Sequence, residues 1–275
     1  MKRFFKAIGK AGFYFILFFG MQLVVSLAFT IVIVTYMMLS GNADMSTFEN
    51  DLIGHTTTII LISNSLSLFA VWLFFVVRKK RFTDEVQLHK YDGKLLLATV
   101  LFGLGFSNVI SWGIGLIPFP QSLVDSFSSS YEAVTLGNPI LNFLSVVVVT
   151  PIAEEVFFRG LVYTRLKRGM STTIAAALSA VIFGIMHGEI IWMFYTFFVG
   201  LALVWIFEKT HSLLSCIVVH AINNCLAHGL ENVTTISPVI EYGILLVSVV
   251  LLIVSTIYIN KHCVGQDAEK IEDVQ

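Results

Sequence analysis

The sequence predicts an all-α protein, a polytopic membrane helix bundle of about eight transmembrane helices with both termini in the cytosol. Of the 275 residues, 56% are hydrophobic and only 13% are charged, whereas soluble domains carry about 25% charged residues. Apolar runs of a length that can cross a bilayer recur along the chain. Lys and Arg gather in every second connection between these runs, which indicates one cytosolic side.

Eight apolar runs are expected to form the membrane helices. They lie at about residues 12–39, 56–77, 95–117, 139–163, 172–188, 190–207, 212–229 and 239–260. The first run follows a basic start, but it exceeds the roughly 7–15 residues of a signal-peptide core and shows no clear cleavage site, so we expect it to be retained. The fifth and sixth runs are separated only by a short corner at Gly188-Glu189.

The positive charges set the orientation. Of the 17 Lys and Arg, we place Arg159 in the membrane, and the other 16 fall before the first run, in every second connection, or in the tail. The opposite loops, near residues 40–55, 118–138 and 230–238, contain none. The positive-inside rule therefore places both termini in the cytosol. We expect the loop at 118–138 to form a re-entrant or amphipathic lid.

We expect a single integral membrane domain over residues 1–275. Its three cysteines give no disulfide framework. Membrane lipid is an expected partner and nucleic acid is not, while the sequence does not determine an oligomeric state. A short chain with eight spans, a basic start and no organelle signal is typical of a multi-pass protein of the bacterial plasma membrane.

Polar side chains interrupt three of the apolar runs. They are Glu154, Glu155, Arg159, His187, His220 and Asn224. A charged side chain at the bilayer centre costs about 2.5–3.5 kcal/mol on insertion scales, so such residues indicate a functional site. At a rise of about 1.5 Å per residue, the groups on the three helices lie at overlapping depths of roughly 14–22 Å. They are therefore expected to face one water-filled cavity within the bundle.

Spacing within the first motif predicts an ion pair. Glu155 and Arg159 are four residues apart on one helical face, where a carboxylate and a guanidinium can pair. Glu154 lies about 100° further around the helix and is left as the freer carboxylate. Pro151 lacks an N–H, so a bend is expected just before the two glutamates.

The other two motifs also predict shared faces. His220 and Asn224 are four residues apart, and Phe183 lies one turn before His187, beneath whose ring it can pack. A carboxylate and an imidazole near one water can act as a general base for attack on a carbonyl. A His and an Asn amide can donate hydrogen bonds to the resulting oxyanion. This set of residues fits hydrolysis of an amide.

Two other interpretations remain open. Buried polar residues also join membrane helices, so the chain could be a non-catalytic immunity or scaffold protein. An intramembrane Glu and His could instead relay protons in a small proton-coupled transporter, although no inverted repeat is evident.

Together the three motifs resemble the CAAX protease and bacteriocin-processing (Abi) family of intramembrane endopeptidases. The resemblance covers about residues 138–230 and rests on Glu154-Glu155-x-x-x-Arg159, Phe183-x-x-x-His187 and His220-x-x-x-Asn224. It implies a catalytic core in this part of a helical bundle.

The resemblance also implies roles for these residues. Glu154 and His187 would activate water, Glu155 would pair with Arg159 to hold the site, and the third motif would line the oxyanion side. The family has been viewed both as zinc-dependent and as a metal-free glutamate type. Because HExxH is missing and the two motif histidines stand on different helices, we expect no cofactor and leave zinc open. The implied substrate is a membrane-associated peptide or protein, as in bacteriocin or pheromone processing or in self-immunity.

Overall fold

The predicted all-helical architecture is confirmed. A computed structural model describes residues 1–41, 44–90, 92–229 and 237–272, without the side chains of Met45 and of residues 263–272. Residues 42–43 and 230–236 of the predicted outer loops lie outside these described ranges. Within the ranges every regular element is a helix.

The elements are α1 (Lys2–Ser40), α2 (Met45–Gly54), α3 (Thr56–Val77), α4 (Phe82–Glu85), α5 (Gly93–Gly115), α6 (Gln121–Thr135), α7 (Pro139–Asn142), η1 (Phe143–Val149), α8 (Thr150–Glu155), η2 (Val156–Tyr163), α9 (Thr164–Leu166), α10 (Thr172–Ile185), α11 (Ile190–Thr210), α12 (Leu213–Gly229) and α13 (Pro238–Glu272). The segments η1 and η2 are π-helical and continue directly into their α-helical neighbours.

All eight predicted apolar runs are helical, but their lengths differ. In the described part of the chain, six helices are long and apolar enough to cross a membrane: α1, α3, α5, the continuous helix Pro139–Leu166, α11 and α13. The other two, α10 and α12, have 14 and 17 residues. At about 1.5 Å per residue they are shorter than a hydrocarbon core of about 30 Å. The predicted eight helices are thus six of spanning length and two short ones.

The ends of the first and last helices differ from prediction. Helix α1 begins ten residues before the predicted start at residue 12, and α13 runs on to Glu272 rather than ending near residue 260. Lys and Arg are good helix formers, so the basic start continues the helix that the apolar run requires. Gly41 ends α1 with a φ of 72°, and its N–H bonds to the Met37 carbonyl, as is common at helix C-termini.

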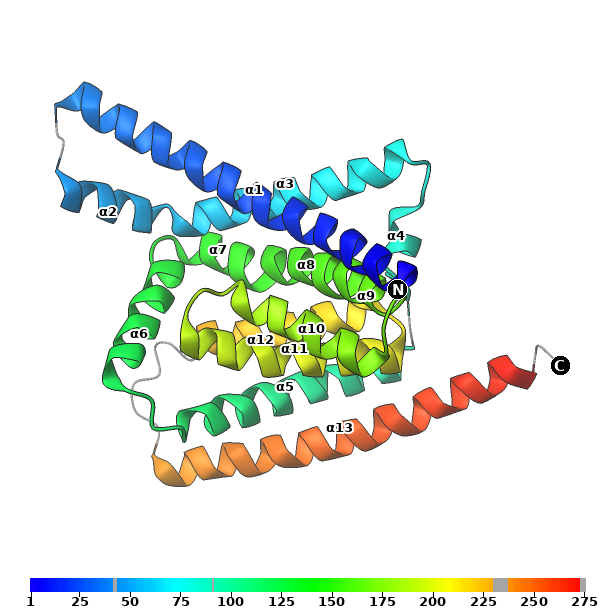
Figure 1. The fold of residues 1–275 in the computed structure, drawn as a ribbon. Coiled ribbons are helices and arrows are strands. Elements are labelled where there is room, and N and C mark those ends of the chain that lie inside the picture. The colour runs from blue at the N-terminus through cyan, green and yellow to red at the C-terminus, as the bar shows by residue number, and fades with distance from the viewer. Residues whose placement is uncertain (42–43, 91, 230–236, 273–275) are drawn as a thin grey trace.

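The short helices lie between two outer groups (Figure 1). Helix α1 packs against α3 and η2, while α13 packs along α5, and α5 in turn contacts α12. Helices α10 and α11 pack against each other, and α11 contacts α12. The start of α1, the end of α13 and the basic connection between α9 and α10 lie at the same end of the bundle (Figure 1). This arrangement agrees with the predicted single side for the Lys and Arg residues.

π-helical turns lie on both sides of α8, the segment that contains Pro151, and the bend expected there stays a prediction. Proline cannot donate a backbone hydrogen bond, and the chain forms η1 before α8 and η2 after it. Such turns change the direction in which successive side chains point, and they are frequent at functional sites. Glu154 and Glu155 end α8, so both lie between the two π-helical segments.

The predicted amphipathic segment at residues 118–138 contains α6. At the end of the bundle away from the termini (Figure 1), apolar side chains of α6 such as Val124 and Phe127 line a cavity. Thr57 Oγ1 donates a hydrogen bond to the Val134 carbonyl at 3.0 Å and so fixes α6 to α3. The amphipathic character is confirmed, and action as a lid stays a prediction.

Gly105 allows α5 and α13 to approach closely. A Cβ at this position would lie 2.6 Å from the Ser248 carbonyl oxygen and 2.7 Å from the Leu252 nitrogen, both backbone atoms of α13. We therefore expect Gly105→Ala to lower the free energy of unfolding in mixed detergent by about 1–3 kcal/mol. Gly113→Ala, on the same helix with nothing within 4 Å of the added Cβ, is the control and should be neutral or slightly stabilising. Equal stabilities of the two variants would contradict close α5–α13 packing.

Candidate active site

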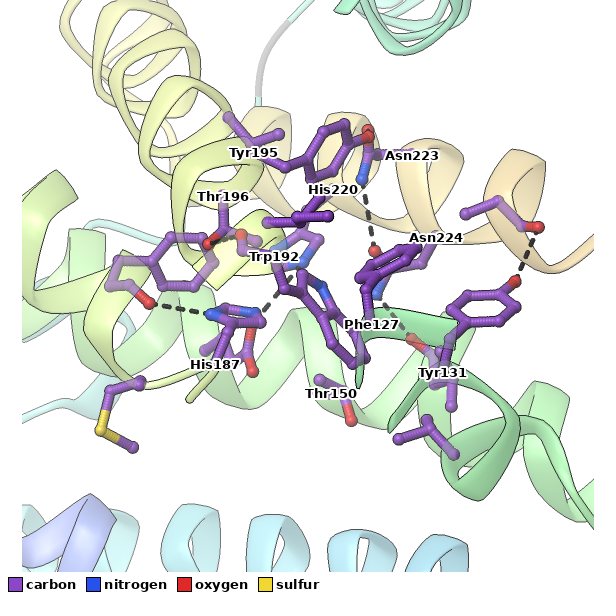
Figure 2. A pocket seen from close by; sticks show the side chains of 18 of the residues that line it. Phe127, Tyr131, Thr150, His187, Trp192, Tyr195, Thr196, His220, Asn223 and Asn224 are labelled. Carbon is purple, nitrogen blue, oxygen red and sulfur yellow. Dashed lines mark hydrogen bonds and ion pairs between the residues drawn. The ribbon is translucent and has the colours of Figure 1, made fainter. Parts of the chain in front are cut away.

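A cavity of about 760 Å³ lies among α1, α3, α6, α8, α11 and α12, and most of its lining is apolar. Four of the six predicted site residues line it: Glu154, His187, His220 and Asn224. Figure 2 shows His187, His220 and Asn224 approaching this cavity, the first from the end of α10 and the other two from α12. The structure therefore brings the three motifs to one place, as their overlapping depths predict.

Glu155 and Arg159 form a fully buried ion pair beside the cavity. Arg159 Nη1 lies 2.7 Å from Glu155 Oε1, and the two side chains are 1% and 0% exposed. The Arg159 guanidinium also lies over the Phe183 ring, 4.3 Å from its centroid. The i, i+4 pairing expected from the sequence is thus present, and Phe183 supports its cationic partner.

His220 connects this ion pair to the cavity. Its Nδ1 lies 2.7 Å from Glu155 Oε1, and its Nε2 lies 3.6 Å from Glu154 Oε2. An ionised carboxylate can only accept hydrogen bonds, so Nδ1 of His220 carries the proton in the 2.7 Å contact with Glu155. His220 therefore contacts both glutamates, an arrangement that the sequence did not predict.

Glu154 is the carboxylate that faces the cavity. Its side chain is 15% exposed, and its buried Oε2 accepts no hydrogen bond from any residue that the structure describes. Buried polar atoms without a partner are rare in proteins, and they indicate that a water or a ligand completes the site. The predicted contrast between a paired Glu155 and a freer Glu154 is present.

His187 is held by the end of α10, the helix that precedes it. Its Nδ1 lies 2.9 Å from the Phe183 carbonyl oxygen, which is an acceptor, so Nδ1 donates and Nε2 of the neutral ring is an acceptor. The ring packs edge-to-face on Phe183 at 5.0 Å and lies 5.7 Å from Trp192. Phe183 also packs edge-to-face on His220 at 5.9 Å, so one ring positions both histidines.

Asn224 shares a face of α12 with His220, as the spacing predicts. Its Nδ2 donates to the Val146 carbonyl at 2.8 Å, which uses one of its two amide protons. The neighbouring Asn223 accepts a hydrogen bond of 2.6 Å from Tyr195 Oη. Figure 2 shows Tyr195 and Asn223 together at one side of the cavity.

Polar residues from the first two spans complete another wall, which sequence reasoning missed. Gln22 Nε2 donates to Asn64 Oδ1 at 2.7 Å, and Asn64 Nδ2 donates to Thr150 Oγ1 at 2.9 Å. All three line the cavity. The sequence did contain a signal for this wall, because the amides of Gln22 and Asn64 lie inside apolar runs, where a polar side chain needs a hydrogen-bond partner. His228 also lines the cavity, and no sequence pattern singled it out.

The donor set does not fit a zinc ion. In the part of the chain that the structure describes, no three His, Cys, Asp or Glu side chains are grouped as metal ligands. Glu155 is already paired with Arg159 and His220. Structural and catalytic zinc sites need at least three protein ligands that converge on one point.

One known protein family matches the part of the chain that contains this site. Residues 136–226 match the family described as type II CAAX prenyl endopeptidase Rce1-like. The predicted family resemblance is confirmed. The match spans about a third of the chain and contains all six predicted site residues of the CAAX protease resemblance. No curated protein and no solved structure matches the chain. The match and the membrane helices support a membrane protein that is a protease of the CAAX type.

Proposed function

We propose that this protein is an intramembrane endopeptidase in which Glu154 activates a water molecule to cleave a peptide bond. The observation that carries the proposal is the unpartnered Oε2 of Glu154, buried in a largely apolar cavity beside His220. The contact of this oxygen with His220 Nε2 is 3.6 Å long, which is too long for a hydrogen bond, so no hydrogen bond from the described residues satisfies it. A water molecule placed there would be within reach of a general base.

Charge balance assigns a proton to the Glu154–His220 pair. With both glutamates ionised and Arg159 protonated, these three groups carry one net negative charge. An uncompensated charge is costly in a buried site, so we propose that Glu154 and His220 share one further proton. With the proton on His220, Glu154 is a base and His220 Nε2 is a donor. The pair can then take a proton from water through Glu154 and donate a hydrogen bond to the oxyanion through His220.

The reaction follows from these positions. Glu154 takes a proton from water while the water oxygen attacks the carbonyl carbon of the scissile peptide bond. The oxyanion accepts hydrogen bonds from His220 Nε2–H and from the second amide proton of Asn224. Glu154 then delivers its proton to the peptide nitrogen, the C–N bond breaks, and a carboxylic acid and an amine result; the acid then loses its proton to the amine, which leaves a carboxylate and an ammonium group. His187, with an unprotonated Nε2, orients the attacking water.

Glu155 and Arg159 act through His220 rather than on substrate. Their ion pair is sealed from the cavity, and Glu155 Oε1 holds the Nδ1 proton of His220. This contact fixes the orientation of the ring, and Nε2 points toward Glu154. The proposed mechanism is therefore of the glutamate type.

The cavity supports an apolar, membrane-associated peptide or protein as the substrate. Apolar side chains from α1, α3, α6 and α11 surround the polar groups, so an extended apolar segment can occupy it. Processing of a bacteriocin or pheromone peptide, or self-immunity, in a bacterial plasma membrane belongs to the same proposal.

The test is hydrolysis by the full chain reconstituted in nanodiscs. The substrates are a library of single-span peptides with varied apolar sequences, digested in water enriched in ¹⁸O. We expect mass spectrometry to find a cleaved peptide whose new C-terminal carboxylate carries one ¹⁸O atom. Because the donors do not fit zinc, cleavage should persist after treatment with a metal chelator.

Two outcomes would overturn parts of this proposal. Absence of cleavage across the library together with proton flux into vesicles would favour a transporter. Cleavage that a chelator abolishes, and that added zinc restores, would replace the glutamate mechanism with a metal-dependent one.

A further inference from the structure

A second, smaller cavity lies at the end of the bundle where Lys and Arg gather. Its volume is about 320 Å³, and it shares no lining residue with the cavity that holds Glu154. Five cationic side chains line it: Lys10, Arg78, Lys80, Arg165 and Arg168. We call these five residues and the space between them the cationic pocket.

The cationic pocket lies where three spanning helices reach the membrane surface. Arg78 directly follows α3, and Arg165 lies in α9, the last turn of the helix Pro139–Leu166. Lys10 stands near the start of α1, just before its long apolar stretch. The charges therefore lie at the level of the lipid headgroups rather than in the hydrocarbon core.

Internal pairing leaves the cationic pocket with an excess of positive charge. Glu85 is the one carboxylate among its described lining residues, and it pairs with Arg165 at 2.6 Å and with Lys80. Partial burial raises the pKa of Glu85, but the Lys80 hydrogen bond and the Arg165 charge outweigh this and hold it below its usual value. Glu85 is therefore ionised at neutral pH, and it offsets one of five positive charges.

The remaining cations repel one another. Lys10 lies among the like charges of Lys6, Arg168 and Arg165. Lys10 and Arg168 are both exposed, so they can turn toward an anion without moving the backbone. An anion between them relieves this repulsion, and neither side chain has to leave an ion pair with any residue that the structure describes.

An aromatic floor lies one turn deeper, toward the hydrocarbon. The rings of Phe13 and Phe74 are 5.4 Å apart, and Tyr14 packs on Phe74 at 6.1 Å. Arg78 lies over the Phe74 ring at 4.8 Å and Arg165 over the Tyr14 ring at 5.6 Å. Phe13 is 46% exposed on the outer surface of α1. The floor of the cationic pocket is thus continuous with the lipid-facing side of the bundle.

We propose that the cationic pocket binds the phosphate headgroup of an anionic phospholipid, whose acyl chain lies along Phe13. Basic pockets between transmembrane helices are suited to such headgroups. A free phosphate ion has a charge that suits the cationic pocket, but it has no apolar group that could pack on the aromatic floor.

The experiment measures lipid retention by the full chain in nanodiscs of phosphatidylcholine with a minor fraction of phosphatidylglycerol. Native mass spectrometry of the released protein counts each retained lipid. We expect retention of phosphatidylglycerol over phosphatidylcholine in the wild type, and about a tenfold lower preference in the Lys10→Gln/Arg168→Gln variant. The control, Lys90→Gln/Lys94→Gln, removes the same charge from exposed positions outside the cationic pocket and should keep the preference.

Two results would overturn the proposal. An equal loss in the control variant would show attraction to the general surface charge rather than to this pocket. Displacement of the lipid by millimolar inorganic phosphate or glycerol 3-phosphate would make it a site for a soluble phosphate. Retention that survives both competitors and depends on Lys10 and Arg168 supports a lipid site.

Discussion

Glu154→Gln is expected to reduce peptide hydrolysis by about 10²- to 10⁴-fold, the usual contribution of a general base. Glutamine keeps the shape of the side chain but cannot take a proton from water. Glu154 lines the cavity and pairs with His220 at 3.6 Å, so the substitution changes the proton balance of that pair with little change in packing. Initial rates on the cleaved peptide from the ¹⁸O experiment measure the effect.

The control for this variant is Glu132→Gln, the same chemical change at an exposed position on α6. It should retain wild-type activity. Both variants should insert into the membrane and unfold at the wild-type detergent concentration, because neither removes a buried hydrogen bond. Full activity in Glu154→Gln would exclude Glu154 as the base.

Arg159→Met is expected to lower the free energy of unfolding by about 3–5 kcal/mol, the cost of leaving one partner of a buried ion pair uncompensated. Methionine fills part of the volume but cannot donate to Glu155, whose carboxylate is fully buried. It also removes the guanidinium that lies over Phe183. Denaturation of the purified wild type and variant in mixed detergent micelles measures the difference in their free energies of unfolding.

Arg81→Met provides the matched comparison. Arg81 pairs with Asp84 at 3.8 Å, and the two side chains are 84% and 57% exposed. Exposed ion pairs contribute about 0–1 kcal/mol, so this change should leave stability nearly unaltered. Similar losses in the two arginine variants would mean that the Glu155–Arg159 pair does not stabilise the core.

Hydropathy predicted the existence of the apolar helices well and their ends less well. Residues 56–77 coincide with α3, because Arg78 follows the apolar run at once. The ends of α1 and α13 could not be predicted in this way, since hydropathy marks the part of a helix that meets lipid and not the part that continues into water. The shortness of α10 and α12 depends on turns, at Gly188 with a φ of 74° and at His211 with a φ of 50°.

Within the candidate site, local geometry was predictable and contacts between helices were not. The Glu155–Arg159 pair and the packing of Phe183 on His187 follow from spacings of four residues. The contact of His220 with Glu155 joins residues 65 positions apart, and it depends on how α12 is rotated against α8. Nor does spacing reveal that the His187 side chain bonds to the Phe183 carbonyl of α10, the helix that precedes it.

The polar bridge from Gln22 through Asn64 to Thr150 joins the first two spans to the helix that carries Glu154. Gln22 and Asn64 lie outside residues 136–226, yet they form a wall of the cavity beside Glu154. Under the proposed function, the bond-breaking groups and part of the surface that meets the peptide therefore lie in separate stretches of chain. Changes in the first eighty residues can alter which peptides are cleaved while the groups that break the bond stay unchanged.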